Sequence, residues 1–120
     1  MKAPDCIIFM DADVSANELI GMIARMMFLD AETIPPCEAD LINNEDYDSV
    51  RRSQFPDGFI YFRYRIEVFC EGAALTERIA LVGRVLEQLW EWGFPAVAAC
   101  DYEKELPHGG GYKSDTIPWP

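Results

Sequence analysis

Two acidic side chains near the N-terminus are the first residues with the chemistry of a site. Asp11 and Asp13 directly follow the apolar run Cys6–Met10, and Ser15 comes two residues later. Oxygen ligands at alternate positions occur in calcium-binding loops of the EF-hand type. Such a loop also needs glycine at its sixth position and glutamate at its twelfth. This chain has alanine and methionine there, so the pattern excludes that kind of calcium loop.

The turn Ile7–Val14 also resembles the strand-end motif of the haloacid-dehalogenase-like phosphatases. The resemblance implies that Asp11 attacks phosphorus, that Asp13 protonates the leaving group, and that both help to hold magnesium. Those enzymes also need a later lysine and a further acidic pair on a larger sheet, whereas only Lys104 and Lys113 follow here. A helix N-terminus favours acids without any catalysis. We therefore expect a structural turn with no catalytic residue, no metal and no cofactor, in which Asp11→Asn costs at most about 1 kcal/mol.

The single histidine and the four cysteines do not indicate a functional site more clearly than the Asp11–Asp13 turn does. His108 precedes three glycines, but no helical pattern follows them, as a phosphate-binding loop requires. Cys6, Cys37, Cys70 and Cys100 are spaced by 31, 33 and 30 residues, without the close pairs of a structural zinc site. The N-terminus lacks the apolar region of a signal peptide. We therefore expect a cytoplasmic protein with four reduced, mostly buried thiols.

The charge of the chain is strongly acidic, with a formal net charge of −11. Nucleic-acid binding needs surplus positive charge, and no apolar run is long enough to cross a membrane, so we expect neither partner. The stretch 30–48 contains many acids and no base. It is typical of a solvated face or of a docking surface for a basic protein. On the second interpretation the contact residues are Glu38, Asp40, Glu45, Asp46 and Asp48.

Hydrophobic periodicity predicts six elements in the order strand, helix, strand, strand, helix, strand. The strands are expected at 6–10, 37–43, 59–70 and 96–102, and the helices at 16–28 and between Gly72 and Gly93. With right-handed crossovers this order predicts an α+β fold, the ferredoxin-like split βαβ plait (βαββαβ). Two helices then cover one face of a four-stranded antiparallel sheet, whose order is fourth, first, third, second strand. Residues 1–120 form a single domain, and 103–120 a C-terminal loop or tail.

The strand at 59–70 alternates strongly between two faces. One set of side chains is expected in the core: Ile60, Phe62, Tyr64, Ile66 and Val68. The opposite set begins at Phe59 and ends at Phe69, on the face that a plait leaves open. An apolar face of this size needs cover, which we expect from the C-terminal tail, a second subunit or a ligand. The residues of this ligand or dimer face are Tyr61, Arg63, Arg65 and Glu67.

Two segments, Phe55–Cys70 and Leu89–Tyr112, resemble small uncharacterised bacterial cytosolic proteins of mobile gene cassettes, some of them beside toxin genes. Acidic immunity proteins are similar in size, charge and single-domain build. The resemblance implies a non-enzymatic acidic protein that masks a basic protein partner. The alternative is a homodimeric small-molecule binder or enzyme that uses the open sheet face, where Arg63 and Arg65 orient an anionic ligand.

Overall fold

The computed structural model describes residues 3–29 and 37–120. Within them the strands are β1 (Cys6–Met10), β2 (Glu38–Asn43), β3 (Tyr64–Phe69) and β4 (Ala96–Ala99). The α-helices are α1 (Ala16–Leu29) and α2 (Leu75–Glu91). Short 3-10 helices lie in the connections: η1 (Arg51–Ser53), η2 (Asp57–Tyr61), η3 (Glu103–Glu105) and η4 (Pro107–Gly111).

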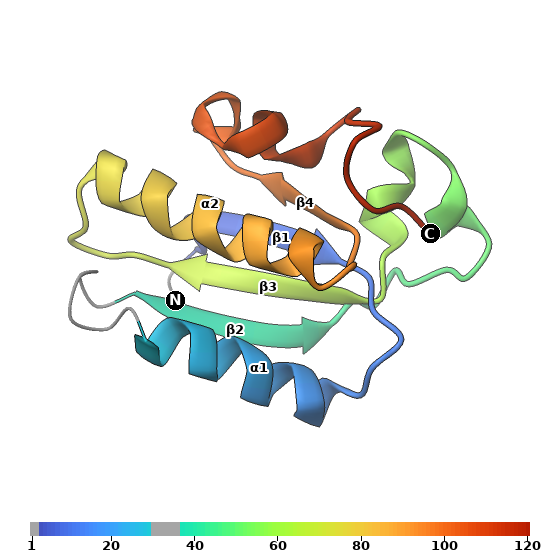
Figure 1. The fold of residues 1–120 in the computed structure, drawn as a ribbon, viewed down its shortest axis with the longest axis horizontal. Coiled ribbons are helices and arrows are strands. Elements are labelled where there is room, and N and C mark those ends of the chain that lie inside the picture. The colour runs from blue at the N-terminus through green and yellow to red at the C-terminus, as the bar shows by residue number, and fades with distance from the viewer. Residues whose placement is uncertain (1–2, 30–36) are drawn as a thin grey trace.

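The strands form one sheet in the order β2-β3-β1-β4, and every neighbouring pair is antiparallel. Read from β4, the order is fourth, first, third, second. Figure 1 shows α1 and α2 on the same side of this sheet, with the orange to red C-terminal segment beyond the β4 edge. The structure confirms an α+β fold with two helices and an antiparallel sheet, with β1 and β3 central and β2 at an edge. Among the described residues, no helix has the length and apolar character needed to cross a membrane.

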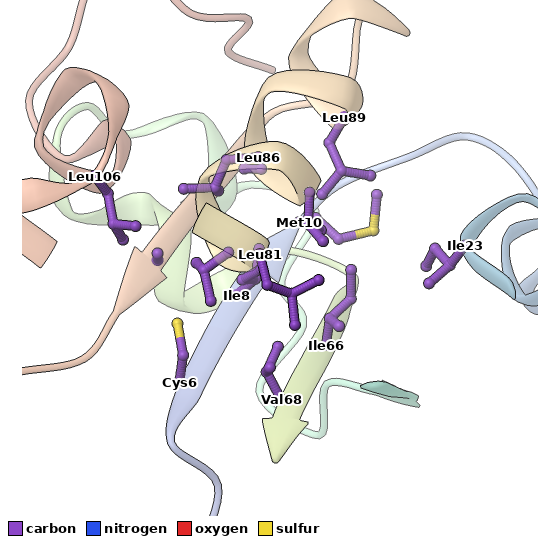
Figure 2. Close-up of a cluster of buried hydrophobic side chains, with 14 of the residues drawn as sticks. Cys6, Ile8, Met10, Ile23, Ile66, Val68, Leu81, Leu86, Leu89 and Leu106 are labelled. Atoms are coloured by element: carbon purple, nitrogen blue, oxygen red, sulfur yellow. The ribbon is translucent and has the colours of Figure 1, made fainter. Parts of the chain in front are cut away.

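The core lies between the sheet and the two helices (Figure 2). Alternate side chains of β1 and β3 are buried there, among them Ile8, Met10 and Ile66. The helices close the same cluster with Leu19 and Ile23 of α1 and Leu81, Val82, Val85, Leu86 and Leu89 of α2. Because one buried cluster joins both α-helices to the same strand side chains, neither α1 nor α2 lies on the opposite face of the sheet.

Both helix ends that the sequence singled out are present. The Ser15 hydroxyl accepts a hydrogen bond from the backbone N–H of Glu18 at 3.3 Å, as an N-cap does. At the end of α2, Gly93 has a φ of +88°, and the N–H of Phe94 donates to the carbonyl of Leu89 at 2.9 Å. This is a Schellman ending. It turns the chain back toward the sheet, so that β4 begins only three residues after Gly93.

The predicted strand at 59–70 is wrong in its first half. Residues Asp57–Tyr61 form η2, β3 begins at Tyr64, and Ile60 is 42% exposed instead of buried. The side-chain amide of Asn44 donates to the carbonyls of Ile60 at 2.9 Å and Phe62 at 2.7 Å. Because these carbonyls are bound by a side chain, they do not take part in a strand ladder. The rest of the prediction is confirmed, since Phe62, Tyr64, Ile66 and Val68 are buried.

The expectation of four reduced thiols is also wrong. Cys37, just before β2, forms a disulfide with Cys70, just after β3, whereas Cys6 and Cys100 are free thiols. The pairing follows from the antiparallel register, since Glu38 lies opposite Phe69 and the next pair outward is Cys37 and Cys70. Sequence spacing could not show it, because the two residues are 33 positions apart. A disulfide is unusual in a reducing compartment, so it does not favour the predicted cytoplasmic location.

The C-terminal segment 103–120 is more ordered than the predicted loop or tail. It contains η3 and η4, and it buries Leu106, Gly111 and Ile117. A Cβ on Gly111 would lie 2.7 Å from the carbonyl oxygen of Ala96, so the segment packs closely on the edge strand β4. Farther on, the Trp119 ring lies 5.2 Å from the Phe62 ring. The segment therefore covers the β4 edge and one end of the sheet.

Candidate functional site

The sheet face without helices carries acids and apolar side chains on neighbouring strands. The register pairs Glu38 with Phe69, Asp40 with Glu67 and Ile42 with Arg65, and paired residues of adjacent strands point to the same side. We call these six residues of β2 and β3 the acidic face. Ile7 of β1 lies opposite Glu67 and extends the face toward the centre of the sheet. The acidic stretch and the open sheet face, predicted as separate surfaces, therefore meet on one surface.

The acidic face holds like charges at close range. Asp40 and Glu67 are directly opposite each other in an antiparallel pair, an arrangement that destabilises a sheet. Arg65 offsets part of this repulsion, because its Nη2 lies 3.3 Å from Oε2 of Glu67. Glu38 and Asp40 are exposed and form no ion pair among the residues that the structure describes. The surface therefore keeps uncompensated negative charge beside the exposed side chain of Ile42.

The predicted ligand or dimer face is split by the structure. Arg65 and Glu67 lie on the acidic face, but Tyr61 belongs to η2 and Arg63 precedes β3. The Tyr61 ring lies under the guanidinium of Arg51, 5.5 Å from its centroid. Because Arg65 is paired with Glu67 and Arg63 lies off the strand, the two arginines do not present a shared free positive charge on β3.

The acids that follow β2 have two different roles. Glu45 and Asp46 are exposed in the turn. Asp48 binds the backbone just before η1, because its Oδ1 accepts hydrogen bonds from the N–H groups of Val50 and Arg51, both at 2.9 Å. The hydrogen bonds from the N–H groups of Arg51 and Val50 lower the pKa of the Asp48 carboxyl below its usual value. Asp48 is thus satisfied within the chain, whereas Glu45 and Asp46 point into solvent after the end of β2.

The β1 side of the open face is covered by aromatic side chains. The Phe59 ring packs edge-on against Phe9 at 5.4 Å and against Tyr112 at 5.7 Å. The Tyr112 hydroxyl donates to Asp57 at 2.8 Å, which ties the C-terminal segment to η2. Phe59 of η2 thus covers Phe9, and the predicted cover by the tail is seen only where Tyr112 packs on Phe59. The open-face side chains of β2 remain exposed, and those of β3 are partly exposed.

A second candidate site lies at the end of the sheet where β1 ends. A cavity of about 420 Å³ is lined there by Asp11, Asp13, Arg52, Phe94 and Trp119, among others. The Asp11 side chain is only 4% exposed and forms an ion pair with Nη1 of Arg52. Its other oxygen accepts a hydrogen bond from the N–H of Arg63 at 2.9 Å. Asp11 therefore joins β1 to the start of β3 and holds the arginine in the cavity wall.

This geometry changes the interpretation of the Asp11–Asp13 turn. Asp11 makes contacts that hold the fold together, and its partners are Arg52 and the backbone N–H of Arg63 instead of the helix N-terminus that the sequence suggested. The expected limit of about 1 kcal/mol is too low for a buried carboxylate with an ionic partner. Arg52 and Trp119 were missed, because 41 and 108 residues separate them from Asp11 in the sequence and no pattern links them. Among the described residues, no group of three or more His, Cys, Asp and Glu is placed to hold a metal ion.

Comparisons with family models, with curated proteins and with solved structures found no match to this chain. The two candidate surfaces are therefore interpreted from their own geometry and charge. One is the exposed acidic face on β2 and β3. The other is the cavity around Asp13 and Trp119, which we call the Asp13 cavity.

Proposed function

We propose that this chain is a non-enzymatic binding protein whose acidic face docks a basic protein. The observation that carries the proposal is the register of β2 on β3, which sets Asp40 and Glu67 side by side in the middle of the face, with Phe69 at one end and Ile42 at the other. Carboxylates that face a basic surface give electrostatic complementarity, and the apolar side chains at the two ends add contact area. Masking a basic surface in this way is how an immunity-type protein would act.

Electrostatics supports a basic partner over an acidic or neutral one. The net charge of −11 gives a negative field around the whole molecule, which raises the rate of encounter with a positive surface. The directly opposed pair Asp40 and Glu67 costs stability in the free protein. A lysine or arginine placed between them would remove that cost, so the repulsion itself favours binding of a basic side chain.

The alternative, a homodimeric binder of an anionic ligand, is less well supported. Two copies of the acidic face would oppose Glu38 and Asp40 to further carboxylates, and like charges across an interface are unfavourable. Arg65, which was expected to orient the anion, is paired with Glu67. For the fold, we infer from the order β2-β3-β1-β4 with both helices on one face that the architecture is the ferredoxin-like plait.

Site-specific photocrosslinking tests the docking surface. The residue to replace is Ile42, which is 39% exposed at one end of the acidic face, two residues from Asp40. The replacement is the photoreactive amino acid p-benzoylphenylalanine. The matched control carries the same group at Ala80, which is exposed on α2. On irradiation in the native host, the Ile42 variant should form an adduct with a protein of high isoelectric point, and the Ala80 variant should not.

Charge variants then test the mechanism. Asp40→Lys should weaken binding of the crosslinked partner about tenfold, mainly through a slower association rate. The control Glu91→Gln, at an exposed position on α2, should leave the association rate unchanged. An adduct with a second copy of this chain would contradict the proposal and support the homodimer. Equal adducts from Ile42 and Ala80 would contradict any specific docking surface.

A further inference from the structure

The Asp13 cavity has an unbalanced charge in its wall. Asp11 and Arg52 form an ion pair, so their charges cancel. The Nε of Arg52 also donates to the carbonyl of Ser49 at 3.4 Å, and its guanidinium lies 5.9 Å from the Tyr47 ring centroid. Asp13 also lines the cavity, and it is exposed and forms no ion pair within the described part of the chain. The wall as a whole therefore carries one uncompensated negative charge.

Aromatic side chains form the rest of the recognition surface. Phe94 and Trp119 both line the cavity. Trp119 is fixed in place, because its indole Nε1 donates to the carbonyl of Ser53 at 3.1 Å and its ring packs against Phe55 at 5.1 Å and Phe62 at 5.2 Å. A rigid aromatic ring beside a free carboxylate is the combination that binds a cationic side chain. The volume of about 420 Å³ falls in the range of small-ligand sites.

We propose that the Asp13 cavity binds an arginine or lysine side chain, with the cation at the Asp13 carboxylate and its methylene stem against Trp119 and Phe94. An anionic ligand would meet Asp13 without compensation, because Arg52 is already neutralised by Asp11. The inference rests on the proposed function, since it makes this side chain an anchor supplied by the basic partner.

A model ligand tests the cavity without the partner. The probe is N-acetyl-arginine methylamide, and its neutral control is the citrulline analogue, which has nearly the same shape without the charge. Each is titrated into isotope-labelled protein, and the NMR signals of the Trp119 indole N–H and of the Asp13 and Phe94 amides are followed. The arginine probe should give saturable shifts at these signals, and the citrulline probe should bind about tenfold more weakly.

Two variants separate the cavity from the general charge of the protein. Asp13→Asn keeps the shape of the side chain and should weaken binding of the arginine probe about tenfold. Glu45→Gln removes an equal charge outside the cavity lining and should leave the affinity within about twofold. The N-acetyl-glutamate analogue should give no saturable shift at the Trp119 indole.

Three outcomes would overturn the cavity proposal. They are equal binding of the arginine and citrulline probes, an Asp13→Asn variant that binds as the wild type does, and saturable binding of the glutamate probe. None of these outcomes tests the docking proposal for the acidic face, which is tested by crosslinking at Ile42. Conversely, a failed crosslink at Ile42 together with arginine-specific shifts at Trp119 would leave a cavity for cationic side chains and refute only the docking of a protein on β2 and β3.

Discussion

At the scale of single residues, burial gives two neighbouring carboxylates different roles. Asp11 has a buried side chain and two partners, the guanidinium of Arg52 and the backbone N–H of Arg63. Asp13, two residues later, is exposed at the cavity mouth. The sequence shows both acids in the same turn and cannot rank them, because the partners of Asp11 come from a segment about 40 to 50 residues away.

Neutralising Asp11 should therefore destabilise the protein more than neutralising Asp13. Asp11→Asn leaves the Arg52 guanidinium without its ionic partner, at a cost of about 2 kcal/mol, below the full value for a buried pair because Arg52 is one-third exposed. Asp13→Asn should change the free energy of unfolding by less than about 0.5 kcal/mol. Urea denaturation of the two variants measures the difference, and equal stabilities would show that the Asp11–Arg52 pair contributes nothing.

The free thiol of Cys6 makes stability depend on alkaline pH. Its pKa is raised above the ordinary thiol value by burial and by the neighbouring Cys100 thiol. Above pH ~8.5 the unfolded chain loses this proton while the folded chain keeps it, so the free energy of unfolding should fall as the pH rises further. Urea denaturation between pH 8 and 10.5 checks the sign. Cys6→Ala should reduce the slope, and a wild type whose stability rises over this range would contradict the assignment.

At the scale of elements, the segment between β2 and β3 is organised by one buried amide. Asn44 is 5% exposed, donates to the carbonyls of Ile60 and Phe62, and accepts from the N–H of Asp46. It therefore holds η2 against the end of β2. It also helps to fix the connection that carries Arg52 to Asp11, and it contributes in this way to the shape of the Asp13 cavity.

Asn44→Ala should destabilise the protein by about 2–3 kcal/mol, because two carbonyls lose their hydrogen bonds in a buried place. The exposed neighbour Asn43 provides the control, and Asn43→Ala should stay within about 0.5 kcal/mol of the wild type. Chemical denaturation gives both values, and hydrogen exchange should show the larger effect in residues 44–62. A variant at position 44 as stable as the control would mean that water replaces the amide without cost.

How well a feature could be predicted from the sequence depends on how far apart along the chain its interacting residues lie. β1, α1, α2 and the Schellman ending at Gly93 could be predicted, because apolar spacing and caps act within a few residues. The start of β3 could not, since the side chain of Asn44 binds the carbonyls of Ile60 and Phe62 from another element. The same holds for the candidate sites: the acids of β2 were visible in the sequence, but their register with Glu67 and the approach of Trp119 to Arg52 and Asp13 arise only on folding.

At the scale of the whole molecule, the negative charge and the small size act together. The chain extends over 39 × 31 × 30 Å and carries a net charge of −11. The screening length is about 30 Å in 0.01 M salt and about 8 Å in 0.15 M salt. At low salt, therefore, nearly every acid repels every other, whereas at physiological salt only neighbours such as Asp40 and Glu67 still do.

Added sodium chloride should consequently stabilise the folded protein. Between 0.01 and 0.15 M, we expect the free energy of unfolding to rise by about 1 kcal/mol as repulsion in the compact state is screened. Asp40→Asn removes a directly opposed charge, so this variant should be more stable than the wild type at low salt, by about 0.5 kcal/mol, and should gain less from salt. Glu91→Gln controls for the loss of one charge elsewhere and should show a smaller effect. Thermal and urea denaturation at several salt concentrations measure these differences. A free energy of unfolding that falls with salt would mean that ion pairs such as Asp11–Arg52 outweigh the repulsion, and that the acidic face does not store the unfavourable charge on which the docking proposal depends.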